Sequence, residues 1–169
     1  MNLDFYFKQL ESSGKAIRAL AQGLSFEQAH WKPDLESWSL LEVINHLCDE
    51  EREDFRAHLA GVLENPIWPW TSIDPQQWVI ERGYNERDLD LSVADFLAER
   101  TASLVWLSGL SHPDWQAAYE MPWGKLTAGD LLASWAAHDL LHLRQMVELR
   151  YACLYQAAQP DRLSYAGEW

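Results

Sequence analysis

Two histidines placed four residues apart on an apolar helix face constrain this chain more than any other feature. His138 and His142 lie within residues 131–146, whose sequence LLASWAAHDLLHLRQM has the spacing of an amphipathic helix. Because an α-helix turns about 100° per residue, the two imidazoles lie one above the other on the face that also carries Trp135 and Leu149. This face is expected to point to the core, where an imidazole is costly to bury unless both nitrogens find partners.

A divalent metal would bind one nitrogen on each ring, and two histidines at this spacing on one helical face are a metal-binding pattern. The alternative is a pair of core histidines joined by hydrogen bonds. We favour the metal, because six histidines distributed at random over 169 residues would seldom give an inward-facing pair of this kind.

Four amphipathic runs joined by long connections predict an all-α protein with the architecture of a four-helix bundle. The runs cover residues 3–24, 39–63, 93–110 and 128–154. The last three each begin with an apolar–Ser/Thr–x–x–acid–apolar pattern, which is typical of a capped helix start. The capping residues would be Ser39, Ser92 and Thr127.

The connections carry their own signals. Residues 65–90 are too interrupted by proline for a long helix and too aromatic for a free linker, so we expect them to pack on the bundle. They contain Pro66, Pro69, Pro75, Trp68, Trp70 and Trp78. Residues 111–126 predict a short extended hairpin around Tyr119–Trp123, with a turn at Gly124. We expect one domain over residues 1–155, with residues 156–169 as a C-terminal tail packed on it.

The charge balance excludes two classes of partner. The chain has 13 Lys and Arg against 26 Asp and Glu, a net charge of −13. This balance argues against binding to nucleic acid or to an anionic membrane surface. No apolar run approaches the length of about 18 residues that a membrane span needs. The N-terminal segment lacks the features of a signal peptide, and Cys48 and Cys153 form no disulfide framework, so we expect a cytoplasmic protein.

A third histidine could complete a metal site. The second helical run carries His46 and, one turn further, Glu50. If the second and fourth helices are neighbours, His46 can converge with His138 and His142. Three imidazoles leave a coordination position for water or substrate, which is typical of catalytic rather than structural sites. Imidazole suits Zn, Ni, Fe and Cu, so the ligands do not identify the ion. We expect Zn or Ni, with Fe or Mn as alternatives.

Glu50 is the candidate catalytic residue. It would accept or relay the proton of a water or thiol bound at the open position. Its alternative roles are a fourth ligand or a hydrogen-bond acceptor for a histidine N–H. Gln145 and Asp139 are further candidates for that orienting role.

Two other residues on the apolar faces are interpreted without a role in the site. Cys48 falls about 200° around its helix from His46, so we expect a packed core thiol rather than a ligand. Arg100 lies in the apolar stripe of the third run, where we expect its stem to pack and its head to reach water. Pairing with a core carboxylate and binding of an anionic ligand are the alternatives for Arg100.

The order of these motifs resembles the DinB/YfiT-like superfamily over about residues 3–152. The matching motifs are Trp38-Ser39, His46-Leu47, Glu50, Trp123-Gly124, Thr127, His138-Asp139-Leu140-Leu141-His142 and Gln145. The resemblance implies a four-helix bundle, often a homodimer, with a metal site formed by His46, His138 and His142. It also implies a small-molecule substrate. The implied activities are metal-dependent hydrolysis, isomerisation, or S-transfer with a low-molecular-weight thiol such as bacillithiol or mycothiol.

Other classes of function remain beside the enzyme. One is a metal-binding or ligand-binding protein without turnover, such as a stress-related sensor or scavenger. Another is an acidic all-α dimer with a histidine-rich core. A ferritin-like di-iron bundle is rejected, because it needs Glu-x-x-His on two long helices and this chain has only Glu27-x-x-His30, beside Pro33.

Overall fold

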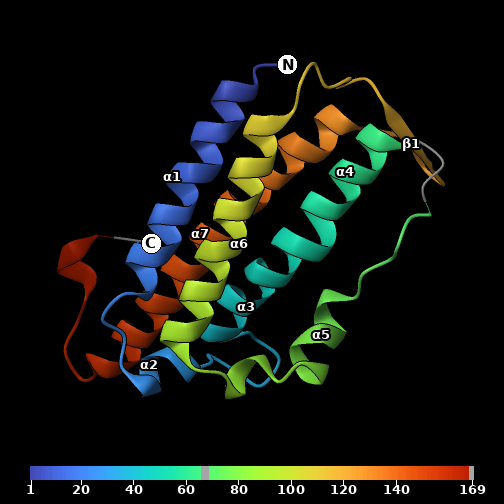
Figure 1. The fold of residues 1–169 in the computed structure, drawn as a ribbon. Coiled ribbons are helices and arrows are strands. Elements are labelled where there is room, and N and C mark those ends of the chain that lie inside the picture. Colours follow the sequence, from blue (N-terminus) through green and yellow to red (C-terminus); the bar gives the residue numbers. More distant parts are fainter. Residues whose placement is uncertain (66–68, 168–169) are drawn as a thin grey trace.

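Four long helices pack side by side in the computed structural model, which describes residues 1–65 and 69–167 (Figure 1). They are α1 (Leu3–Ala21), α6 (Leu89–Gly109), α7 (Ala128–Ala157) and a composite helix made of α3 (Leu40–Glu50), a π-helical turn η1 (Glu51–Phe55) and α4 (Arg56–Glu64). The predicted all-α four-helix bundle is therefore confirmed. Among the helices of the described ranges, none is long and apolar enough to cross a membrane.

Short elements fill the connections. They are α2 (Phe26–His30), α5 (Pro75–Glu81), the 3₁₀ turns η2 (Tyr84–Glu86) and η3 (Ser164–Ala166), and the strands β1 (Ala118–Met121) and β2 (Gly124–Thr127). The two strands pair antiparallel, with Met121 opposite Gly124. The predicted hairpin is present, but its turn consists of Pro122 and Trp123, just before the predicted Gly124. Gly124 is the first residue of β2 and has a φ of 135°, a conformation that favours glycine.

Two of the three predicted helix starts hold as written. Ser39 and Thr127 each accept a hydrogen bond from the backbone N–H three residues on, and the acid at that position bonds back. The predicted cap at Ser92 is wrong, because α6 begins one turn earlier with Asp88 accepting from the Leu91 N–H. Asp caps a helix as well as Ser does, so the helix already begins after Asp88 and Ser92 lies inside it.

The connection after α4 returns along the α3–α4 side of the bundle (Figure 1). Trp70 stacks on His58 of α4 with ring centroids 3.8 Å apart, and α5 packs against α3. Asp74 caps α5 and Pro75 occupies its first turn. The predicted packing of this connection on the bundle is thus seen for its described part; Pro66 and Trp68 lie outside the described residues.

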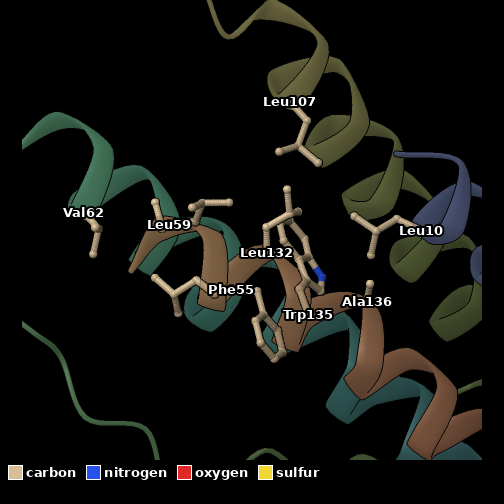
Figure 2. Packing of buried hydrophobic residues seen from close by; sticks show 10 residues of the cluster. Leu10, Phe55, Leu59, Val62, Leu107, Leu132, Trp135 and Ala136 are labelled. Atoms are coloured by element: carbon tan, nitrogen blue, oxygen red, sulfur yellow. The ribbon is translucent and has the colours of Figure 1, made fainter. Parts of the chain in front are cut away.

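The core consists of two apolar clusters separated by polar groups. Figure 2 shows the cluster in which Phe55 and Trp135 stack with ring centroids 5.8 Å apart, beside Leu132 and Leu10. A second apolar cluster surrounds Ile44 at the other end of the bundle. Between the clusters lies a central polar layer, to which all four long helices contribute. Its members are Ser13, Glu50, Glu51, Arg100, His138, Asp139 and His142.

Arg100 corrects one prediction directly. Its side chain is only 4% exposed, and its head lies in the central polar layer rather than in water. It pairs with both Glu51 and Asp139. The prediction that the head reaches water is wrong, because two buried carboxylates on neighbouring helices supply the partners that water would otherwise provide.

Candidate metal centre

Three histidines from two helices meet at one point, and two of them belong to the central polar layer. His46 comes from the middle of α3, and His138 and His142 come from adjacent turns of α7. The Nε2 atom of His142 lies 3.0 Å from the Nε2 atom of His46 and 3.0 Å from that of His138. The predicted convergence of the three rings is therefore found, and their ligand atoms all lie within 4.8 Å of one another.

Packing and a hydrogen bond fix the orientation of these rings. The Trp38 ring lies against His46 with centroids 4.8 Å apart, and Phe55 lies against His138 at 5.0 Å. His142 Nδ1 is 2.7 Å from Gln145 Oε1, so Nδ1–H donates to this amide oxygen and Nε2 is left with a free lone pair. Gln145 thus has the orienting position that the sequence predicted.

The ring nitrogens cannot all be satisfied by one another. If His46 carries its proton on Nε2, its buried Nδ1 presents a lone pair to the Glu50 carboxylate, 3.5 Å away. If the proton is on Nδ1, two lone pairs face each other at 3.0 Å between His46 and His142. His46 Nδ1 has no hydrogen-bond partner in the structure. A cation shared by the three Nε2 atoms removes this conflict. His46 can then carry its proton on Nδ1, on the side of Glu50, while the facing Nε2 lone pairs bind the ion.

The electrostatic surroundings keep His46 and His142 neutral. Burial, together with the neighbouring His142 and His138 rings, lowers the pKa of His46 to about 2. Burial and the His138 ring lower the pKa of His142 to about 4. Both imidazoles are therefore unprotonated at neutral pH, which is the form that binds a metal.

Glu50 lies at the edge of the histidine cluster. It is the last residue of α3, its side chain is 6% exposed, and its Oε2 atom is 3.1 Å from His138 Nε2. The carboxylate thus reaches the site where the three nitrogens converge. This position fits a base or a fourth ligand, and the three predicted ligands and Glu50 lie together as the sequence suggested.

A cavity of about 670 Å³ opens onto the cluster. Its lining includes Trp38, His46, His142 and Gln145, and also the carboxylates of Glu36 and Glu148. No lysine or arginine is among the lining residues in the part of the chain that the structure describes. A small molecule entering this cavity meets two imidazoles, an indole and carboxylates.

Asp139, a predicted candidate, and Cys48, predicted to lie outside the site, both have other surroundings. Both carboxylate oxygens of Asp139 accept hydrogen bonds from Arg100, so Asp139 is held by the guanidinium and not by a ring of the cluster. Cys48 is buried, burial raises the pKa of its thiol to about 12, and it lies outside the histidine cluster, as expected of a packed thiol.

Glu51 is the buried residue that sequence reasoning missed. It is 1% exposed and accepts hydrogen bonds from both Arg100 and Trp135. A signal was present, because Asp49, Glu50 and Glu51 follow one another and together span about 200° of a helix. An amphipathic helix with a wide apolar face cannot keep all three carboxylates in water.

Comparison with known families assigns the chain. The sequence pattern of the DinB superfamily matches residues 9–146. The chain belongs to the DinB superfamily. This membership confirms the resemblance stated from the motifs, and it covers all four residues of the candidate site.

Among solved structures, the chain resembles YfiT from Bacillus subtilis. The TM-score is 0.77 and the sequence identity 16%, over 87% of this chain and 85% of that chain. YfiT is described as a probable metal-dependent hydrolase with an unusual four-helix bundle topology. At this identity the likeness shows a shared fold. No curated protein matches the chain.

Proposed function

We propose that this DinB-superfamily protein is a divalent-metal-dependent enzyme of the hydrolase type, with His46, His138 and His142 as the metal ligands. The observation that carries the proposal is the convergence of three imidazole nitrogens around a hydrogen-bonding conflict that a shared cation resolves. The description of YfiT as a probable metal-dependent hydrolase supports the reaction type.

The residues around the three nitrogens have distinct tasks in such an enzyme. A bound divalent ion lowers the pKa of a water to roughly 7 and so supplies a nucleophile at neutral pH. Glu50 would accept the proton of this water at Oε2, which lies 3.1 Å from His138 Nε2. Gln145 holds His142 in the tautomer with a free Nε2 lone pair, and the Trp38 ring packs against His46 where both line the cavity.

The cavity favours neutral or cationic small molecules as substrates. Glu36 and Glu148 in its lining, together with the acidic net charge of −13, repel anions. Hydrolysis of a neutral or amine-bearing substrate is therefore favoured over conjugation of a thiol that carries carboxylates. S-transfer remains the second candidate, because a metal with an open position also deprotonates a thiol.

Metal analysis tests the ligand set. The protein purified without chelator should contain about one Zn²⁺ or Ni²⁺ per chain by elemental mass spectrometry, with Fe and Mn as the alternatives. His138→Ala should lose this metal. The matched control is His112→Asn, since His112 is exposed and its φ of 51° suits asparagine. Full metal content in His138→Ala would refute the site.

Activity against a panel of esters, amides and lactones tests the reaction, with thiol conjugation as the second arm. Glu50→Gln should lower kcat about 10²- to 10⁴-fold while the metal content stays unchanged. Loss of metal in Glu50→Gln would instead make Glu50 a ligand. A metal-loaded protein that turns over neither class of substrate would favour the alternative of a metal- or ligand-binding protein without catalysis.

The homodimer and the cytoplasmic location are further proposals that rest on family resemblance and composition. Light scattering on the purified protein tests the first, and fractionation of cells tests the second. Binding to DNA and RNA at low salt, which the net charge of −13 disfavours, should be undetectable by gel shift.

A further inference from the structure

The guanidinium of Arg100 joins two helices next to the candidate metal centre. Arg100 Nε and Nη2 donate to the two oxygens of Glu51, each at 2.8 Å. Nη1 and Nη2 donate to the two oxygens of Asp139 at 2.6 and 2.8 Å. Nη1 also donates to the Leu10 carbonyl at 2.8 Å. These contacts use all the N–H groups that an arginine side chain has.

Each of the two carboxylates that bind Arg100 belongs to a residue directly next in sequence to a residue of the candidate metal centre. Glu51 directly follows Glu50, and Asp139 directly follows His138. Glu50 Oε2 and His138 Nε2 are themselves 3.1 Å apart. The one guanidinium, supplied by α6, therefore sets the spacing between the two backbone segments that carry the candidate base and a candidate ligand.

The π-helical turn explains how two consecutive residues, Glu50 and Glu51, can reach the histidine cluster and Arg100, respectively. Glu51 is the first residue of η1, and both Glu50 and Glu51 are buried, at 5% and 1% exposure. A π-helical turn inserts an extra residue into a helix and is frequent at functional sites. Here Glu50 reaches the histidines while Glu51 is held by Arg100, and by the Trp135 indole N–H at 2.9 Å.

A contribution to the stability of the fold does not by itself explain the buried ion pairs of Arg100 with Glu51 and Asp139. Buried ion pairs can often be replaced by apolar residues of similar volume without loss of stability, whereas their directional bonds do fix geometry. Resting on the proposed metal centre, we propose that Arg100 is a positioning residue for it. Through Glu51 and Asp139, Arg100 holds the Glu50 carboxylate and His138 at the separation that the bound metal requires.

A charge-neutral replacement of the cluster tests this role. The triple variant Arg100→Met, Glu51→Gln, Asp139→Asn leaves no uncompensated charge and keeps an acceptor for Trp135. Co²⁺ is the probe, since its visible absorption reports ligand geometry independently of turnover. Relative to the unmodified protein, the triple variant should bind Co²⁺ about 10- to 100-fold more weakly and with an altered spectrum.

Two further variants keep the result interpretable. Arg100→Lys retains the charge but not the paired hydrogen bonds, and it should show the same change in spectrum with a folded circular dichroism signal. Arg56→Met is the matched control, because Arg56 joins α4 to Glu99 of α6 away from the histidines. It should leave Co²⁺ affinity and spectrum unchanged.

The outcomes separate this proposal from the proposed function. Unchanged Co²⁺ affinity and spectrum in folded Arg100→Lys or in the triple variant would overturn the positioning role while leaving the metal centre in place. Failure of the unmodified protein to bind Co²⁺, Zn²⁺ or Ni²⁺ would overturn the proposed function itself.

Discussion

Replacing Arg100 by methionine alone should destabilise the metal-free protein strongly, and in a pH-dependent way. The substitution preserves much of the stem's volume but leaves Glu51 and Asp139 buried, at 1% exposure each, without their cation. Burial raises the pKa of Asp139 even with Arg100 present. Without the guanidinium, the pKa of Asp139 should rise further, so that its carboxyl group is forced to take up a proton in the folded state.

The size of the effect follows from this protonation. Keeping one carboxyl with an unfolded-state pKa of about 4 neutral at pH 7 costs about 4 kcal/mol, at about 1.4 kcal/mol per pH unit. Breaking a buried pair by removing one partner typically costs about 3–5 kcal/mol. We therefore expect a deficit of about 4 kcal/mol or more at pH 7, a large part of the stability of a domain of this size.

The sign of the pH dependence follows from proton uptake. Between pH 4 and the raised pKa of Asp139, the folded variant binds more protons than the unfolded chain, so its free energy of unfolding falls as the pH rises. The deficit should shrink by about 1.4 kcal/mol or more per pH unit on going from pH 7 towards pH 5. Contributions of the histidines are common to both proteins and cancel in the difference.

Urea denaturation of chelator-treated protein, followed by circular dichroism at several pH values, measures this difference. The neutral triple variant described above should recover stability relative to Arg100→Met and lose the pH-dependent deficit. Lys8→Met, which removes an exposed pair with Asp4, should change stability by less than about 1 kcal/mol. A deficit for Arg100→Met that is below about 1 kcal/mol, or the same at pH 5 and pH 7, would refute the reasoning.

Three further predictions follow from named contacts. The pKa values of His46 and His142 lie below the ordinary histidine value, so below about pH 6.5 the unfolded chain binds more protons than the folded chain. The metal-free protein should therefore lose stability as the pH falls, by up to about 1.4 kcal/mol per pH unit for each ring. His46→Gln should reduce this slope in urea titrations, and an unchanged slope would contradict the prediction. Gln145→Leu should weaken Zn²⁺ binding about 10- to 100-fold by calorimetry, because the His142 tautomer is no longer fixed, and equal affinity would count against that role. Thr127→Ala should cost about 1 kcal/mol in urea denaturation through loss of the α7 cap, whereas Thr101→Ala, at an exposed position inside α6, should cost less.

Local signals carried most of what the sequence could predict. The His138–His142 pair and the caps at Ser39 and Thr127 depend only on residues within one or two turns, so their geometry follows from the helix itself. The helix α5 carried such a signal as well, in Asp74 followed by Pro75, but the surrounding prolines obscured it.

What could not be predicted depends on contacts between helices. Whether Arg100 reaches water or a carboxylate is decided by Glu51 and Asp139, which lie 49 and 39 residues away along the chain. The π-helical turn at Glu51–Phe55 has no sequence signature comparable to a capping box, since it depends on the packing of several helices at once. The convergence of His46 with the α7 histidines followed only once α3 and α7 were assumed to be neighbours.

The central polar layer has a consequence for how the protein acquires its ion. Sliding any long helix along its axis by one turn, about 5.4 Å, would press charged or imidazole groups into the leucine-rich packing on either side. Misaligned arrangements of the same four helices are thereby penalised before any ion is present. Metal loading and exchange should therefore proceed on an already assembled scaffold, without passage through an unfolded chain.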